Sequence, residues 1–354
     1  MGDTSKPEIF RTILMQINPS EILSIDSLKI GYITGKKETT LLPPLCARAN
    51  KGELIAVIGR NGVGKSTLLR TITGLQPSLD GEILFRGKNI MNYSRMQLAR
   101  EVGYISTELV KVSNMSVYDL VSLGRFPHTD WMGKIDNENH NAILNALDNT
   151  SMSGYCKRFV SELSDGERQR AMIARLLAQN TAIMIMDEPT AFLDIGSKYE
   201  ILHLMSLLAH DNEKTIIFST HDLQMAINQA DKIWLVLYDK LIEGAPEDLM
   251  IAGAFDHLFE SSHVQFNSED GTFSFRSLER GSIYLEGEGI KKHWVEKAIN
   301  RAGFSVSEDK TIPYITIRDT KNCDYLLTSH NLVRQFGTIY DLVTFLSKEN
   351  LLSI

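Results

Sequence analysis

A glycine-rich segment between a strand pattern and a helix pattern constrains this chain most strongly. The segment follows the β-branched run 52–58 and leads into a helix that starts at Lys65. The glycines allow backbone N–H groups to curl around a phosphate, and the helix start adds roughly half a positive charge there. The spacing is G-x-x-x-x-G-K-[ST], and the residues are Gly59, Arg60, Asn61, Gly62, Val63, Gly64, Lys65, Ser66 and Thr67.

Two side chains of this segment have separate chemical tasks. Lys65 can reach the β- and γ-phosphates of a nucleotide as a point charge, and the hydroxyl of Ser66 can ligate Mg²⁺. The alternative is a glycine-rich turn that only caps the helix. Average residue usage gives this pattern by accident in about one chain of this length in a hundred, and the strand–helix context makes the accident rarer. The segment therefore predicts a phosphate site.

A second motif consists of two carboxylates at the end of a short apolar strand. Asp187 and Glu188 directly follow the apolar run 182–186. An aspartate at the tip of a buried strand suits Mg²⁺, and the next carboxylate is then placed to orient or deprotonate a water molecule opposite the γ-phosphate. Acidic residues often end strands, so the motif is weak by itself. Together with the glycine-rich segment, it predicts phosphoryl transfer.

A third motif introduces the helix pattern 168–177 and consists of Ser164, Asp165, Gly166 and Glu167. Serine and glycine at a helix start leave N–H groups that can bind an anion. The alternative is a capping box between Ser164 and Glu167. Both interpretations can hold, because a capped helix start is what organises those N–H groups.

The order of the elements predicts an α/β fold. Strand patterns alternate with helix patterns as far as residue 105, and residues 115–180 are mostly helical in pattern. The runs 182–186 and 215–219 are wholly apolar, as in strands buried on both faces of a parallel sheet. We therefore expect a parallel core with a helical insertion.

A boundary is expected near residue 277, after the turn cluster 267–272. The segment 277–354 holds ten acidic and ten basic residues, so the whole net charge of −7 lies in 1–276. Its pattern is a strand, a helix, two strands and a last helix, which predicts a small α+β domain. The two predicted domains are 1–276 and 277–354.

Composition excludes several classes of protein. A net charge of −7 disfavours a protein that coats nucleic-acid phosphates or binds an anionic membrane by itself. The three cysteines, Cys46, Cys156 and Cys323, are far apart and form no C-x-x-C pair, which fits a reducing compartment. Neither a signal-peptide run in 1–20 nor a stretch of 18 apolar residues occurs. We expect a cytosolic protein, or one held at a membrane by a partner.

Over residues 22–276 the chain resembles the nucleotide-binding subunit of an ABC transporter. Besides the three motifs, it has a D-loop at Ala191–Asp194 and a switch histidine at His221, all in the family order. The resemblance implies a RecA-like core, an antiparallel β subdomain and a helical insertion at about 107–165. It also implies a head-to-tail homodimer with two Mg·ATP at the interface, each between the glycine-rich segment of one protomer and the Ser164–Glu167 turn of the other.

The resemblance also assigns roles to residues. Glu188 is the general base, Lys65 and His221 contact the phosphates, and Asp194 completes the site from the partner protomer. Tyr32 would stack on adenine, a contact worth about 1–3 kcal/mol; the alternative is an ordinary core or surface tyrosine. Asp187 and Ser66 would hold Mg²⁺.

One position departs from the family. The glutamine expected after the strand 103–105 is replaced by Thr107, and Glu108 follows it. Thr107 is too short to reach the metal, whereas Glu108 could supply an oxygen ligand. We expect Glu108 to take over the role of the glutamine in Mg²⁺ binding and in coupling to the membrane partner.

The segment 116–128, which ends in Gly124, Arg125, Phe126, Pro127 and His128, resembles the ATPases of iron-siderophore, haem and cobalamin importers. Its alternative is an ordinary helix end, with Gly124 and then Pro127 as stop signals. The resemblance implies a permease dimer as partner, a substrate-binding protein acting indirectly, no nucleic acid, and a peripheral location on the cytoplasmic face of the inner membrane.

Two other functions compete with this importer. One is a soluble ABC ATPase that acts on ribosomes or DNA, although such proteins usually have two cassettes or a long coiled-coil insertion. The other is an ABC ATPase of another transport class that is regulated by residues 277–354. The tail contains no ligand motif that would decide between regulation and dimer assembly.

Overall fold

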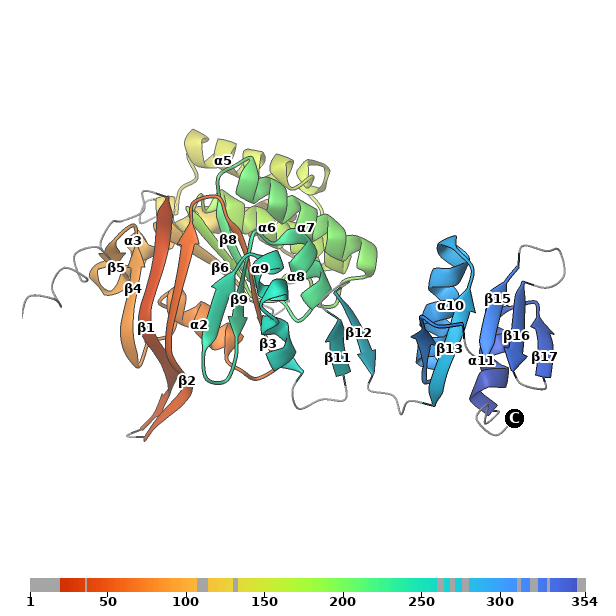
Figure 1. Cartoon of the computed structure of the whole chain (residues 1–354). Coiled ribbons are helices and arrows are strands. Elements are labelled where there is room, and N and C mark those ends of the chain that lie inside the picture. The colour runs from red at the N-terminus through yellow and green to blue at the C-terminus, as the bar shows by residue number, and fades with distance from the viewer. Residues whose placement is uncertain are drawn as a thin grey trace, which may run out of the picture. The chain divides into compact units, whose positions relative to one another are not determined.

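The computed structural model describes residues 20–35, 37–106, 114–129, 133–259, 264–267, 271–275, 280–310, 313–318, 324–329 and 332–348. The chain divides into two compact units (Figure 1): Met1–Ser262 with Phe266–Phe273, and His263–Gln265 with Ser274–Ile354. The boundary expected at residue 277 falls among residues 276–279, which lie outside the described part.

A six-stranded sheet forms the centre of the first unit, in the order β10-β9-β3-β8-β7-β6. All neighbours are parallel except β9 and β10, which pair antiparallel. The strands are β3 (Leu54–Gly59), β6 (Val102–Ile105), β7 (Ile183–Met186), β8 (Thr215–Ser219), β9 (Lys232–Val236) and β10 (Leu241–Gly244). The predicted parallel α/β core is therefore confirmed.

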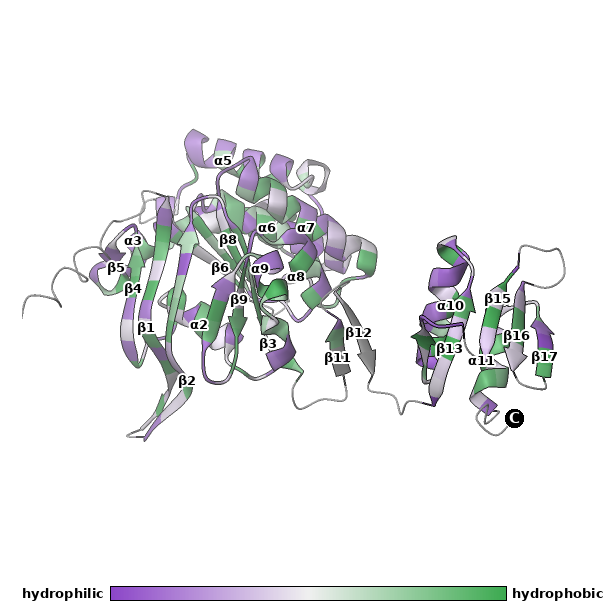
Figure 2. Ribbon diagram, in the orientation of Figure 1, coloured by the Kyte–Doolittle hydropathy of each residue, from purple (hydrophilic) through white to green (hydrophobic). Residues whose placement is uncertain are grey.

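Both faces of this sheet are buried. Leu54, Ala56 and Ile58 of β3 belong to one apolar cluster, and Ile55 and Val57 belong to another on the opposite face. Figure 2 shows the central strands largely hydrophobic, whereas helix α5 at the rim carries many hydrophilic residues. Around the sheet lie α2 (Lys65–Ile72), α7 (Ile195–His210), α8 (Leu223–Gln229), α9 (Pro246–Ile251) and the 3₁₀ helix η5 (Ala254–Leu258).

A second sheet, in the order β2-β1-β4-β5, is antiparallel. Its strands are β1 (Glu21–Thr34), β2 (Lys37–Asn50), β4 (Asp80–Phe85) and β5 (Lys88–Asn89), and η1 (Ile90–Asn92) and α3 (Arg95–Glu101) follow it. Strand β2 was not predicted from the sequence. This strand contains Pro43 and Pro44 and lies at the edge of the sheet, where proline is tolerated.

The helical insertion contains α4 (Val117–Ser122), η2 (Leu123–His128), α5 (Asn137–Asn149), η3 (Ser153–Tyr155), η4 (Val160–Glu162) and α6 (Asp165–Ala178). In η2, Arg125 is buried, and its guanidinium donates to the Asn139 side chain at 2.7 Å and to the Ala178 carbonyl at 2.8 Å. His128 Nε2 lies 2.9 Å from the Gln179 carbonyl oxygen. A cationic side chain near the C-terminus of a helix interacts favourably with the helix dipole and the last carbonyl groups, so this segment caps α6. Phe126 of the same segment is exposed.

Replacement of Gly124 by alanine should destabilise this contact. A Cβ on Gly124 would lie 2.1 Å from the Arg175 carbonyl oxygen, so η2 must move away from α6. We expect a loss of about 1–3 kcal/mol, measured as a lower urea midpoint by circular dichroism. Gly154→Ala is the matched control, because its Cβ would meet no atom within 4 Å. Equal midpoints for the two variants would contradict the packing described.

The second unit is a mixed sheet with two helices. Its strand order is β14-β13-β15-β16-β17, with β13 parallel to both neighbours and the other pairs antiparallel. The elements are β13 (Gly281–Glu286), α10 (Gly289–Arg301), β14 (Phe304–Ser307), β15 (Tyr314–Ile317), β16 (Tyr325–Ser329), β17 (Leu332–Phe336) and α11 (Ile339–Lys348). One apolar cluster joins sheet and helices. The short strands β11 (Val264–Asn267) and β12 (Thr272–Phe275) pair with each other.

Candidate functional site

The glycine-rich segment joins β3 to α2 as predicted. Gly62 and Gly64 have φ of 79° and 114°, a region that favours glycine. A Cβ on Gly59 would lie 2.5 Å from the Val236 carbonyl oxygen, so the close contact with β9 also requires glycine. No side chain caps the start of α2, where Gly64 is the N-cap residue. The first N–H groups of α2 can therefore bind an anion.

Lys65 is buried at the start of α2. Its Nζ donates to the carbonyl oxygens of Gly59 at 2.8 Å and Arg60 at 3.4 Å. Burial lowers the pKa of the Lys65 amine, and the carboxylates of Glu188 and Asp187 act in the opposite direction. Lys65 therefore lies within electrostatic range of both predicted carboxylates.

Asp187 lies at the tip of β7 with 3% of its surface exposed. Hydroxyls from both neighbouring strands contact its carboxylate. Ser219 Oγ of β8 donates to Oδ1 at 2.6 Å, and Tyr104 OH of β6 lies 3.4 Å from Oδ2. Neither hydroxyl was predicted from the sequence, because each contact depends on strand pairing rather than on a local motif.

Glu188 combines a partly exposed side chain with an unusual backbone conformation. Its φ is 49°, in the left-handed region, which costs a non-glycine residue roughly 1–2 kcal/mol. Its N–H donates to Ser219 Oγ at 2.9 Å, and its carbonyl accepts the Ala191 N–H at 3.0 Å. Glu188 Oε1 lies 3.3 Å from Nδ1 of His221, whose side chain is 56% exposed. The pair is therefore accessible to a water molecule and a phosphate.

The Ser164–Glu167 turn caps α6. Ser164 Oγ accepts the Glu167 N–H at 3.3 Å, and the Glu167 carboxylate accepts the Ser164 N–H at 2.8 Å, so the predicted capping box is present. The bond from the Ser164 backbone lowers the pKa of Glu167. Arg168 pairs with Asp165 at 2.8 Å.

The same turn lies beside the D-loop of its own chain. A Cβ on Gly166 would lie 3.1 Å from Ser197 Oγ, which donates to Asp194 Oδ2 at 2.7 Å. The Ser197 N–H also donates to Asp194 Oδ1, and this bond lowers the pKa of Asp194. A cavity of about 270 Å³ lies here, lined by residues of this turn, of helices α6 and α7 and of the segment 151–155. The turn and Asp194 therefore form a second group of predicted site residues.

Two further predictions concern the rim of the site. Tyr32 OH lies 2.8 Å from Thr67 Oγ1, and the ring is about half exposed, so Tyr32 stands beside the start of α2. Thr107 and Glu108 lie outside the described residues.

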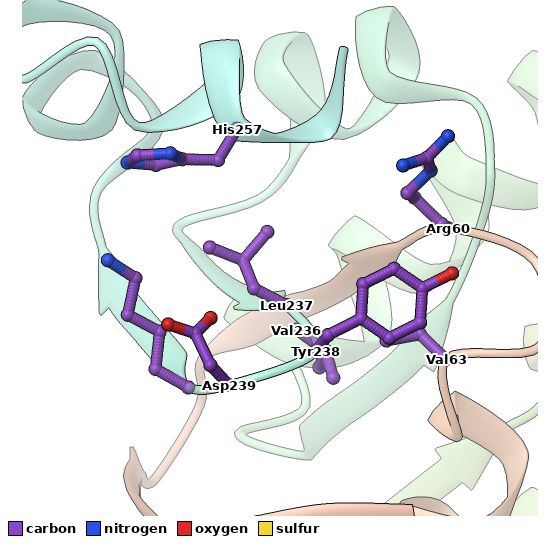
Figure 3. A pocket seen from close by; sticks show the side chains of 8 residues that line it. Arg60, Val63, Val236, Leu237, Tyr238, Asp239 and His257 are labelled. Atoms are coloured by element: carbon purple, nitrogen blue, oxygen red, sulfur yellow. The ribbon is translucent and has the colours of Figure 1, made fainter. Parts of the chain in front are cut away.

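Another pocket of about 410 Å³ adjoins the glycine-rich segment (Figure 3). Arg60 and Tyr238 lie at one side of it, and His257 and Asp239 lie at the other. None of the predicted catalytic side chains lines this pocket. The candidate active site is therefore the group Lys65, Asp187, Glu188 and His221 rather than this pocket.

Comparison with known proteins identifies the family. Residues 44–191 match the ABC transporter family, and residues 280–347 match the iron ABC transporter C-terminal domain. An ABC transporter ATP-binding protein of Methanocaldococcus jannaschii is 33% identical over 257 residues, which are 72% of this chain and 87% of that protein. The ferric enterobactin transport ATP-binding protein FepC of Escherichia coli is 34% identical over 235 residues, 66% of this chain and 85% of FepC.

A solved structure agrees with this assignment. A chain from an ABC transporter assigned to the metal-chelate type, in an inward-facing conformation, has a TM-score of 0.60 and 26% identity, and the match covers 72% of this chain and 95% of that chain. The chain therefore belongs to the family of ABC transporter ATP-binding proteins, which implies ATP binding and a place in a transporter complex. Its second unit matches the C-terminal domain of the iron-transporting members.

The predicted fold class, RecA-like core and family are thus confirmed. Within the described ranges, none of the helices combines the length and hydrophobicity needed to cross a membrane.

Proposed function

We propose that the chain is the ATPase subunit of an iron-chelate ABC importer and that Lys65, Asp187, Glu188 and His221 form its catalytic half-site. The observation that carries the proposal is the convergence of these groups: the buried Lys65 amine lies in the field of both carboxylates, and Glu188 contacts His221 at 3.3 Å. The two sequence alternatives, a non-transport ATPase and another transport class, find no support in the family matches.

Binding begins at the loop. The uncapped N–H groups of α2 attract the β-phosphate, and the Lys65 amine exchanges the Gly59 carbonyl for β- and γ-phosphate oxygens. This exchange replaces a neutral acceptor by an anionic one, so a direct attraction between opposite charges is added to the hydrogen bond. The Lys65 amine therefore interacts most strongly with its acceptors when the triphosphate is bound.

Hydrolysis requires a base and a stabilised γ-phosphate. Glu188 accepts a proton from water, the resulting hydroxide bonds to the γ-phosphorus, and the bond from phosphorus to the bridging oxygen breaks to release ADP and phosphate. His221, which contacts Glu188, is placed to hold a γ-phosphate oxygen. Positioning and charge stabilisation supply most of the rate.

The donor set fits Mg²⁺, which prefers oxygen ligands. The Asp187 carboxylate and the Ser66 hydroxyl would hold it, and Glu108 is proposed as a further ligand. When bound, Mg²⁺ would neutralise part of the phosphate charge. If Glu108 has this role, Glu108→Ala raises the Mg²⁺ concentration needed for half-maximal phosphate release; an unchanged requirement and unchanged coupling would exclude it.

A head-to-tail dimer would complete the site. The Ser164–Glu167 turn and Asp194 adjoin each other through Ser197. In the proposed dimer, this second group of residues from the partner protomer covers the γ-phosphate bound to Lys65. ATP binding would close the two half-sites, and hydrolysis would reopen them.

The partner and cargo follow from the family. Membership in the iron-transporting group supports a permease dimer, which the helical insertion would contact, at the cytoplasmic face of the membrane. FepC is a ferric enterobactin transport protein, and this relationship supports a ferric siderophore as cargo, rather than haem or cobalamin. The cargo itself would contact the permease and its binding protein.

Phosphate release by the purified chain tests the ATPase half of the proposal directly. We expect turnover that requires Mg²⁺ and stops in EDTA. The absence of turnover in a folded, ATP-binding chain would contradict the proposed catalytic half-site.

Tyr32→Ala should weaken ATP binding about 5- to 150-fold, because base–aromatic stacking contributes about 1–3 kcal/mol. Tyr32→Phe, which keeps the ring and removes only the contact with Thr67, should bind within a few-fold of wild type. Isothermal titration with ATP distinguishes the two variants. Equal losses for both would assign the effect to the hydroxyl and not to stacking.

A further inference from the structure

We propose that Ser219 is a positioning residue for the active site, where one buried hydroxyl aligns Asp187 and Glu188 together. The inference rests on the proposed function, in which Glu188 activates water and Asp187 faces Mg²⁺. None of the sequence motifs includes Ser219, which is the last residue of β8.

The hydroxyl of Ser219 forms hydrogen bonds with Asp187 and Glu188 at the same time. It donates to Asp187 Oδ1 at 2.6 Å and accepts the Glu188 N–H at 2.9 Å. A serine hydroxyl has one donor and two acceptor positions, so the single proton is committed to Asp187. Ser219 is completely buried, and water cannot easily replace it.

Strand pairing places this hydroxyl. β7 and β8 are parallel neighbours, and Met186 pairs with Phe218. Asp187 and Ser219 therefore follow the last paired residues of adjacent strands. The Tyr104 hydroxyl contacts Asp187 from the opposite neighbour β6, but only at 3.4 Å, so Ser219 provides the shorter restraint.

Ser219 also restrains the backbone of Glu188. Glu188 adopts a φ of 49°, a conformation that persists only when the surroundings hold it. Its N–H is held by Ser219 and its carbonyl by Ala191. The direction of the Glu188 side chain toward His221 depends on this backbone. Loss of the hydroxyl therefore misaligns the base and the aspartate in one step.

The test compares two buried hydroxyls at opposite ends of the same strand. Thr215 of β8 is also fully buried, and its hydroxyl donates to Asn50 and accepts from Gly52. Ser219→Ala should lower kcat about 10- to 100-fold, the usual effect of losing a partner behind a metal ligand. Thr215→Val should stay within twofold of wild type, with a comparable loss of stability.

A binding measurement separates positioning from general damage. In a Glu188→Gln background, Ser219→Ala should weaken ATP binding about tenfold with Mg²⁺ and leave it unchanged in EDTA, because the loop and Lys65 remain intact. In the chain with an intact Glu188, Ser219→Cys supplies a weaker hydrogen-bond donor. Its kcat should therefore lie between the kcat of the wild type and that of Ser219→Ala. Equal weakening in Mg²⁺ and EDTA, or wild-type kcat for Ser219→Ala or Ser219→Cys, would overturn the proposal.

These measurements test the proposed function and the role of Ser219 separately. A wild-type chain that releases no phosphate would contradict the proposed function. An active wild type with an equally active Ser219→Ala variant would contradict only the role of Ser219.

Discussion

Glu188→Gln should abolish turnover and leave ATP binding intact. The amide keeps the shape of the side chain but cannot accept the proton of the attacking water, and loss of a general base costs about 100- to 10,000-fold in rate. Because the bound ATP is not cleaved, the two half-sites should stay closed. Phosphate release measures the first effect, and light scattering with Mg·ATP measures the dimer.

A matched control for this variant exists in the same unit. Asp231 also contacts a histidine, with Oδ2 2.9 Å from His210 Nε2, and it accepts the Leu54 N–H at the other end of β3. Asp231→Asn removes a carboxylate of a similar pair outside the proposed site. Asp231→Asn should keep wild-type turnover. Near-normal turnover of Glu188→Gln would show that the general base is assigned wrongly.

Lys65→Met should also stop hydrolysis, by about 100- to 1000-fold, because a preorganised charge on the β- and γ-phosphates is lost. Unlike Glu188→Gln, it should also weaken ATP binding, and no ATP-dependent dimer should form. Isothermal titration and phosphate release measure both effects on one sample.

The control for Lys65 is a second lysine, which is partly buried and also donates to a backbone carbonyl. The Lys214 amine donates to the Thr181 carbonyl at 2.9 Å and to the Asn180 side chain, and burial lowers its pKa as it does for Lys65. Lys214→Met should affect stability alone. If the two lysine variants lost ATP binding to the same extent, the effect would follow from the loss of any desolvated lysine amine and not from the phosphate site.

Local sequence patterns predicted the parts of the site that are contiguous in the chain. The loop from Gly59 to Thr67 and the pair Asp187–Glu188 each lie where a strand ends, so local spacing sufficed. The contacts of Ser219 could not be predicted in this way, because they depend on the pairing of β7 with β8 across 32 residues. The left-handed backbone of Glu188 also has no sequence signal, since glutamate rarely adopts it.

In the fold, too, elements with a clear local pattern were predicted, whereas elements without one were missed. The apolar strands β7 and β8 were predicted from their composition, but β2 was missed because two prolines and an exposed, polar first half hide the strand pattern. In the second unit, the edge strands β14 and β17 were missed, since polar residues dominate their exposed positions. The segment Gly124–His128 was interpreted as a family pattern or as an ordinary helix end. Its cap on α6 could not be predicted, because it depends on the packing of α5, α6 and η2.

The importer function is tested by affinity purification of tagged Glu188→Gln protein from detergent-solubilised membranes of its own cells, with mass spectrometry of the co-eluting proteins. An importer subunit should recover a polytopic permease of the iron-chelate type in amounts comparable to the chain itself. Recovery of only soluble partners, or of ribosomes, would contradict the importer function even if the chain hydrolyses ATP.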